Sequence, residues 1–281
     1  MTNEYGNELL HKVLLSAMKD IDKICRENGL KYYLYAGTLL GAVNHKGFIP
    51  WDDDVDIVMF PEDFDQLKQI IESDYSDRYR IENWRNSEKH YSLLNKFLIN
   101  GGKIIYSDGT QSEIFIDLSV LYGVPNSRLS RYLQRFELEM LDKITSVKSG
   151  SIIPTSLISK VTIGILAKLP KMRICTLRDF IVKRFDKNNC ANYALMVHLL
   201  SNPYTGMNGY DNDMVSADLL KNPQYIPFED TQFMVYSDPI ADLTRRYGFD
   251  FAKPYPEEKR VSKHSIVGYE ISEELMERIS K

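Results

Sequence analysis

The strongest constraint on this chain is a run of acidic residues that leads directly into an apolar segment. The sequence reads Pro50-Trp51-Asp52-Asp53-Asp54-Val55-Asp56-Ile57-Val58-Met59-Phe60. A solvated acidic loop does not pass at once into β-branched residues, so this run predicts a strand from about residue 54 to 60. Side chains alternate across a strand, which places Asp54 and Asp56 on one side and Val55 and Ile57 on the other. Two adjacent carboxylates repel each other, and a hard divalent cation such as Mg²⁺ is the usual counter-charge.

The composition is that of a globular protein with ample material for a core. Hydrophobic residues make up 43% of the 281 residues, enough for one large domain or two modest ones. The net charge of −4 gives no general attraction to nucleic acid, so no nucleic-acid partner is expected. The three cysteines are widely spaced, which argues against a disulfide framework or structural zinc and favours a cytoplasmic protein. The N-terminal residues are polar and acidic, unlike a signal peptide, and no apolar run is long enough to span a bilayer.

Hydrophobic periodicity predicts a mixed sheet for the first part of the chain. Apolar residues at helical spacing between Leu10 and Ile24, followed by Gly29, predict a helix, and a strand should follow near 31–35. Gly37-Thr38 should begin a short helix, with Thr38 as its N-cap. A helix should start at Pro61, and strands are expected near 79–84, 91–99, 103–106 and 113–118. This order favours an α/β (α+β) fold with a mixed sheet core.

The rest of the chain is expected to form two further parts. Residues 1–125 would be the catalytic core, 126–200 a helical insertion, and 201–281 a C-terminal region that completes the active site, with one or two strands in 228–238 and a helix over 240–247. Within the insertion, residues 155–184 hold seven basic residues and one acid, a net charge of +6, interleaved with apolar residues. Such a stretch could lie on an anionic membrane surface, or could simply be a helical subdomain with a basic outer face.

Asp117 is the best third partner for the acidic pair. It is a lone acid inside the apolar segment Ile114-Phe115-Ile116-Asp117-Leu118, where a carboxylate is costly to bury unless it is paired or binds a metal. We therefore expect Asp54, Asp56 and Asp117 to be catalytic and to hold Mg²⁺, with Mn²⁺ as an alternative. The 1, 3, 5 spacing of Asp52, Asp54 and Asp56 also matches an EF-hand, but Ile57 and Asp63 stand where that loop needs Gly and Glu.

Gly37 and Thr38 are candidates for binding phosphate. Glycine lets the backbone approach a ligand closely, and N–H groups at a helix start favour phosphate oxygens. Together with three carboxylates they would supply what metal-assisted phosphoryl transfer needs. His45 and Lys46 lie between the two motifs and are candidates for contact with phosphate charge, unless they are simply solvated loop residues. An Asp-x-Asp motif also occurs in nucleotide-sugar glycosyltransferases, which generally place a longer α/β unit before it.

These residues together resemble the signature of the LicD family, whose bacterial members include phosphocholine transferases and which includes the animal fukutin proteins. The resemblance is carried by Ala36-Gly37-Thr38-Leu39-Leu40-Gly41-Ala42-Val43 and by His45-Lys46-Gly47-Phe48-Ile49 running into the acidic segment. Lys96, the segment 114–118 with Gly123-Val124-Pro125, and the stretch from Tyr247-Gly248 to His264 resemble later blocks of the family. The chain departs from the family pattern at Asn44, where arginine is common, and at Ser119, Val120 and Tyr122.

The resemblance implies a nucleotidyltransferase-like fold and a defined chemistry. A phospho-alcohol such as phosphocholine would pass from a CDP-alcohol donor to a sugar hydroxyl of a cell-surface polysaccharide or teichoic acid precursor, releasing CMP. The acceptor would be a glycan or a lipid-linked glycan, at the inner face of the bacterial plasma membrane. Asp117 would also take the proton of the attacking hydroxyl, and Gly37 and Thr38 would hold donor phosphate.

Other residues are assigned supporting roles in this scheme. Lys96 and Lys46 would offset charge on the leaving CMP, and His264 would contact substrate, act as an acid or make a structural hydrogen bond. If the alcohol is choline, an aromatic face should receive its ammonium, with candidates Trp51, Trp84 and Tyr91. Three rival functions remain at this stage: a glycosyltransferase releasing a nucleoside diphosphate, a nucleotidyltransferase releasing pyrophosphate, and a non-catalytic protein on the same fold.

Overall fold

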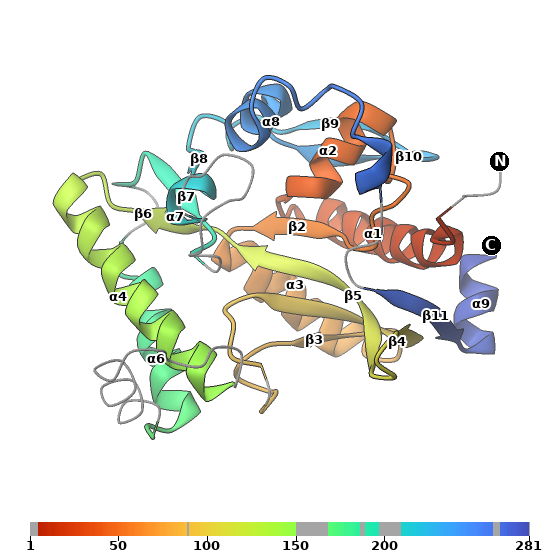
Figure 1. The fold of residues 1–281 in the computed structure, drawn as a ribbon, viewed down its shortest axis with the longest axis horizontal. Coiled ribbons are helices and arrows are strands. Elements are labelled where there is room, and N and C mark those ends of the chain that lie inside the picture. The colour runs from red at the N-terminus through yellow and green to blue at the C-terminus, as the bar shows by residue number, and fades with distance from the viewer. Residues whose placement is uncertain are drawn as a thin grey trace. The chain divides into compact units, whose positions relative to one another are not determined.

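The computed structural model describes residues 5–88, 90–149, 168–185, 189–196, 209–260 and 265–280. The chain forms two compact units, each built from separate stretches of sequence (Figure 1). Unit 1 comprises Met1–Ile81, Lys96–Ser119 and Lys221–Lys281, and unit 2 comprises Glu82–Asn95 and Val120–Leu220. The functional division at residues 125 and 200 stays a prediction.

Unit 1 is built on a mixed sheet, and the expected α+β class is confirmed. Among the described residues, the strand order is β1-β2-β5-β4-β11, and β3 also pairs with β4. The strands are β1 (Tyr32–Leu34), β2 (Asp56–Met59), β3 (Tyr79–Glu82), β4 (Asn95–Tyr106), β5 (Gln111–Val120) and β11 (Ile266–Ile271). β1 runs antiparallel to β2, with Leu34 opposite Ile57, and β11 runs antiparallel to β4. The acidic segment therefore enters an interior strand.

Helices α1 (Glu8–Asn28) and α3 (Pro61–Asp74) form part of the core of unit 1 and lie behind the sheet in the view of Figure 1. The apolar face predicted for α1 is buried, from Leu10 to Ile24. Gly29 ends α1 in the left-handed conformation, with φ of 67°, which glycine adopts without strain. Pro61 is the first residue of α3, as expected.

Two predictions about local structure in unit 1 were wrong. Helix α2 (Ala36–His45) has Tyr35 as its N-cap, so Thr38 lies inside the first turn rather than capping it. The segment 95–106 is one long strand, although the sequence predicted two strands separated by glycines. Gly101 has a φ of 86°, and a side chain at Gly102 would meet Ile114 and Leu275, so the glycines keep the strand continuous beneath helix α9 (Glu273–Ile279).

The C-terminal part of unit 1 adds a hairpin and helix α8 (Pro239–Tyr247) beside α2. Strands β9 (Gln224–Phe228) and β10 (Thr231–Val235) pair antiparallel, and α8 packs against α2. Of the one or two strands expected in 228–238, β10 lies in that range, whereas β9 ends where that range begins; the helix expected over 240–247 is confirmed. A short 3-10 helix, η2 (Glu257–Lys259), precedes β11. Strand β11 and helix α9 were not predicted.

Unit 2 contains helices α4 (Arg128–Lys148) and α6 (Lys171–Val182), short α7 (Gly209–Asn212), and a small sheet of β6 (Tyr122–Val124), β7 (Asn192–Ala194) and β8 (Val215–Ser216). The expectation that residues 126 to about 198 are helical is therefore wrong at β7, which pairs antiparallel with β6. The expected helix over 128–147 is confirmed. None of the helices in the described ranges combines the length and apolar content that a membrane crossing needs.

Candidate active site

The acidic cluster lies where β2 begins, beside β5. Asp54 and Asp56 are partly exposed whereas Val55 and Ile57 are buried, so the predicted alternation is confirmed. On β5, Asp117 is partly exposed between buried Ile116 and Leu118, and its N–H donates to Val55 O at 2.9 Å. The strand pairing thus brings the lone acid of β5 next to the Asp-x-Asp pair.

The carboxylates are close enough to perturb one another. The pKa of Asp56 is raised well above its usual value, first by desolvation and then by the charges of Asp54, Asp117 and Asp52. In addition, one ligand atom each from Asp52, Asp53 and Asp54 lie within 4.8 Å of one another. An oxygen-only set of this kind suits a hard cation such as Mg²⁺, which would relieve the mutual repulsion. Of the predicted ligands Asp54, Asp56 and Asp117, this group contains only Asp54, so the chemistry of the acidic loop suits a hard cation while the predicted ligand set stays a prediction.

The first turn of α2 is placed against the start of β2. Thr38 is buried, and its hydroxyl accepts a hydrogen bond from the N–H of Asp56 at 2.9 Å. The first bond within the helix runs from Leu39 N–H to Tyr35 O, so the N–H groups of Ala36, Gly37 and Thr38 lie ahead of it at the helix N-terminus. This turn and the carboxylates are therefore adjacent, as a site for a metal-bound phosphate requires.

Gly37 is required for this close approach. A Cβ at position 37 would stand 2.9 Å from Oδ2 of Asp52, closer than ordinary contacts allow. The absent side chain lets the acidic loop lie directly against the first turn of α2.

The loop that carries the aspartates is fixed by α1, which sequence reasoning did not detect. Asn7 Nδ2 donates to the carbonyl of Asp52 at 3.1 Å, and His11 Nε2 lies 2.8 Å from the same oxygen. Burial lowers the pKa of His11, which stacks on Phe48 with ring centroids 4.2 Å apart. A neutral imidazole therefore holds the loop.

Arg246 is a second functional candidate that the sequence did not reveal. It is buried in α8, lies over the ring of Tyr35 at 4.1 Å, and its Nε is 3.6 Å from Asp242 Oδ2. Its charge opposes the rise in the pKa of Asp56. The spacing of Asp242 and Arg246, one helical turn apart on an amphipathic helix, was the available signal.

Lys96, Lys46 and His264 were also predicted to bind substrate, and the structure describes the first two. The Lys96 ammonium on β4 is 3.6 Å from the ring centroid of Phe115, which precedes Asp117 by two residues on the same strand. Lys46 is exposed at the C-cap of α2, and its carbonyl accepts from Glu229 N–H at 2.7 Å. His264 lies outside the described residues, as does the 155–167 part of the basic segment.

Trp51 belongs to an aromatic cluster beside the acidic loop. Its ring stacks on Tyr255 at 6.0 Å, meets the edge of His45 at 5.9 Å, and carries the guanidinium of Arg260 at 5.2 Å. These contacts involve residues far along the chain and fix the residue immediately before Asp52. Its role as a substrate-binding residue stays a prediction.

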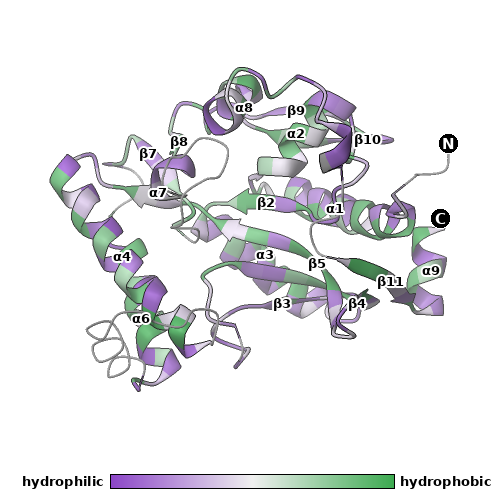
Figure 2. Ribbon diagram, viewed as in Figure 1, coloured by the Kyte–Doolittle hydropathy of each residue, from purple (hydrophilic) through white to green (hydrophobic). Residues whose placement is uncertain are grey.

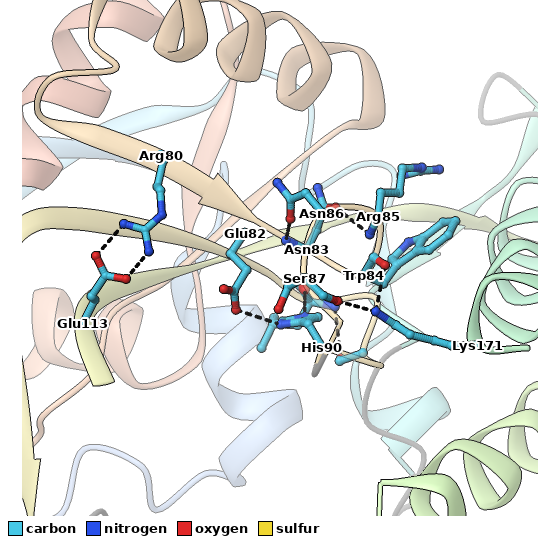
Figure 3. A network of polar contacts seen from close by, with 12 residues as sticks. Arg80, Glu82, Asn83, Trp84, Arg85, Asn86, Ser87, His90, Glu113 and Lys171 are labelled. Carbon is cyan, nitrogen blue, oxygen red and sulfur yellow. Dashed lines mark hydrogen bonds and ion pairs between the residues drawn. The ribbon is translucent and has the colours of Figure 1, made fainter. Parts of the chain in front are cut away.

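The other two candidates for binding an ammonium already face cations of the protein. In unit 2, the Arg85 guanidinium lies 4.2 Å from the Trp84 ring centroid, and the Lys171 ammonium lies 5.4 Å from that of Tyr91. Figure 3 shows Lys171 reaching the backbone of Trp84 and Ser87, and its ammonium donates to the carbonyl oxygens of both. These contacts indicate that the 83–91 loop is held by internal cation–π and hydrogen-bond interactions.

Comparison with known proteins shows which family model and which relatives this chain matches. Residues 29–128 match the family model described as LicD/FKTN/FKRP, nucleotidyltransferase domain. The lipopolysaccharide cholinephosphotransferase LicD of Haemophilus influenzae is 26% identical over 264 residues, which cover 92% of this chain and 95% of that protein. The chain therefore contains a segment that matches this family model, and it resembles a LicD protein over most of its length. The resemblance inferred from the sequence is confirmed.

Two further relatives match over shorter stretches. The ribitol 5-phosphate transferase FKRP of Homo sapiens is 45% identical over 42 residues, which are 15% of this chain and 8% of that protein. The uncharacterized protein RP689 of Rickettsia prowazekii is 48% identical over 58 residues, covering 21% of this chain and 22% of the relative. The two relatives with named activities thus carry different phospho-alcohols in their names.

Proposed function

We propose that this protein is a Mg²⁺-dependent enzyme of the LicD family that transfers a phospho-alcohol, such as phosphocholine, from a CDP-alcohol to a sugar hydroxyl. The observation that carries the proposal is the convergence of Asp54, Asp56 and Asp117 beside the first turn of α2. The full-length similarity to a cholinephosphotransferase supports the class of reaction. A nucleotidyltransferase-like fold is part of the same proposal and is supported by the description of the matching family model.

The site residues would have two roles, metal binding and phosphate binding. Asp54, Asp56 and Asp117 would hold the metal, which when bound neutralises phosphate charge and polarises the phosphorus centre. The N–H groups at the start of α2 would bind phosphate oxygens, and the Thr38 hydroxyl, which accepts from Asp56, still has its own proton to donate.

The reaction would be one displacement at phosphorus. Asp117 would take the proton from the acceptor hydroxyl as the new O–P bond forms and the P–O bond to CMP breaks. Lys96, with its ammonium next to Phe115, would offset charge on the departing CMP. Arg246 would supply fixed positive charge behind Asp56.

The acceptor is proposed to be a glycan or a lipid-linked glycan at the inner face of the bacterial plasma membrane. The name of the Haemophilus influenzae relative favours lipopolysaccharide, with a teichoic acid precursor as the alternative. The described part of the basic segment, 168–184, supports peripheral membrane contact because α6 exposes Met172, Leu177 and Phe180 beside basic residues.

The deciding experiment is an incubation with Mg²⁺ and a panel of CDP-alcohols, including CDP-choline and CDP-ribitol, with a glycan acceptor, analysed by mass spectrometry. Release of CMP with acceptor mass increased by the phospho-alcohol supports the proposal. Pyrophosphate with a nucleotidylated acceptor would show a nucleotidyltransferase, and a nucleoside diphosphate released from a nucleotide sugar would show a glycosyltransferase. Asp117→Asn serves as the inactive control, because it keeps the size of the side chain.

A further inference from the structure

Helix α4 in unit 2 exposes an apolar stripe along its N-terminal half. Leu129, Tyr132, Leu133 and Phe136 are 68%, 60%, 49% and 52% exposed. Their spacing of i, i+3, i+4 and i+7 puts them on one face of the helix. Figure 2 shows apolar and polar residues alternating along α4. Four large apolar side chains this exposed on consecutive turns indicate a surface that contacts a partner.

The other side of α4 is committed to the interior of unit 2. Leu138 and Leu141 are buried, and Gln134 is buried with its Nε2 donating to Ile181 O of α6 at 3.1 Å. The exposed stripe is therefore the outer face of a helix that is already anchored, and it is presented on a rigid element.

The sequence beside the stripe is basic. Arg128, Arg131 and Arg135 fall within residues 128–136, which contain no Asp or Glu. Arg135 lies within ion-pair distance of both Glu139 and Asp211, so the excess positive charge comes from Arg128 and Arg131. The acids later in α4 each lie within ion-pair distance of an arginine: Glu137 with Arg184 at 2.9 Å, Glu139 with Arg135 at 3.1 Å and Asp142 with Arg178 at 3.6 Å. The N-terminal half of α4 thus combines uninterrupted apolar surface with basic residues.

We propose that the stripe Leu129, Tyr132, Leu133 and Phe136 docks α4 on an anionic membrane surface. Leucine and aromatic side chains would enter the boundary between headgroups and acyl chains, while the arginines beside them meet anionic headgroups. Charge complementarity selects this occupant over a neutral apolar protein surface. The proposal is independent of the reaction proposed above, since it concerns a different element.

The stripe on α4 is distinct from the basic segment at 155–184, which the sequence predicted as a possible membrane contact. On α6, Arg173 is exposed between Met172 and Leu177 and interrupts the apolar face. On α4 no charged residue lies within the stripe, because the arginines at 128, 131 and 135 fall outside the i, i+3, i+4, i+7 positions.

The test uses the full chain and vesicles of phosphatidylcholine with or without phosphatidylglycerol, in a co-sedimentation assay. The variant is Leu133→Ser with Phe136→Ser in α4. Its control is Val267→Ser with Met276→Ser in β11 and α9, two other apolar side chains, exposed by 64% and 40%. We expect the α4 variant to bind anionic vesicles about tenfold more weakly, and the control variant to bind like the parent protein.

Several results would overturn the proposal. Parent protein that does not bind phosphatidylglycerol vesicles, or an equal loss of binding in the control variant, would do so. So would light scattering that shows a dimer which the α4 variant dissociates, because the stripe would then be an interface between copies of the chain. Circular dichroism of both variants checks that they fold; substitution of exposed side chains is expected to leave the helices intact.

Discussion

Asp56 lies among three other carboxylates, and the energetic consequence can be measured. Replacing it with Asn removes one charge from the repelling set while keeping the side-chain size. We expect Asp56→Asn to raise the melting temperature in the absence of metal, by about 2–4 °C for each kcal/mol of relieved repulsion. The same variant should lose the stabilisation by MgCl₂ and release no CMP. Differential scanning fluorimetry with and without MgCl₂ measures the first two effects.

A matched control is Asp108→Asn, at the exposed turn after β4. The pKa of Asp108 is lowered by its hydrogen bonds to Thr110, so its charge is favoured locally rather than opposed. This variant should keep both activity and the response to MgCl₂. An Asp56→Asn protein that melts lower than its parent without metal would show that the carboxylates do not repel in the fold.

Thr38 connects α2 to the start of the acidic strand through one hydrogen bond. In Thr38→Val the shape is kept but the N–H of Asp56 loses its acceptor, at a cost of about 1–3 kcal/mol. Thr38→Ser keeps a hydroxyl and should retain most of the stability and activity. Urea unfolding gives the free energy of unfolding of each variant, and a larger loss in Thr38→Ser than in Thr38→Val would show that packing of the methyl group matters more than the hydroxyl.

Residues whose chemistry conflicts with their sequence neighbours could be found without a structure. Asp54, Asp56 and Asp117 stand out because charge within an apolar segment needs a reason. Asn7 and His11 do not, since an ordinary amphipathic helix also carries polar residues, and their contact with the carbonyl of Asp52 spans more than forty positions. Such roles are set by tertiary contacts rather than by local pattern.

At the scale of the element, α8 depends on a buried ionic group. The carboxylate of Asp242 is fully buried, 2.7 Å from Arg245 Nη2 and 3.6 Å from Arg246 Nε. Asp242→Asn would leave two arginines without this counter-charge, and we expect a loss of about 3–5 kcal/mol in the free energy of unfolding. Asp238→Asn on the same helix should cost little, because Asn also caps a helix and Asp238 accepts from Ala241 N–H. Chemical denaturation of the Asp242→Asn and Asp238→Asn variants measures the difference between their free energies of unfolding.

Elements were predictable where periodicity and end signals agreed, and failed where tertiary packing determined the outcome. Helix α1 had both an apolar face and Gly29, and it is correct to its last turn. Gly101-Gly102 suggested a turn, yet the chain continues as a strand because α9 packs over the glycines. Strand β7 was missed because three residues carry too little pattern to identify. Strand β11 completes the sheet by pairing with β4, and no local sequence signal predicts this pairing.

For the whole molecule, the acidic cluster predicts an unusual dependence of stability on pH. Because the folded protein raises the pKa of Asp56, this group favours folding at low pH, and its contribution is lost as pH rises through the raised value. The stability difference between the parent and Asp56→Asn should therefore widen, without metal, as the pH rises from the ordinary carboxyl pKa of 3.8 toward the raised value. With MgCl₂ it should narrow or reverse, since the metal prefers the ionised carboxylate. Melting curves across this range, with and without MgCl₂, measure the effect, and a pH-independent difference would contradict it.

The contacts that hold the acidic loop and the start of α2 also determine when the site can form during synthesis. Glu229 accepts from Phe48 N–H at 3.0 Å, the Tyr269 hydroxyl donates to Asn7 at 3.3 Å, and Arg246 lies over Tyr35. These partners leave the ribosome about two hundred residues after the loop itself, with all of residues 120–220 made in between. Unit 1 is therefore completed only when its last third has been made. A nascent or truncated chain would lack the contacts that hold the proposed site, and folding should include a slow, long-range closing step.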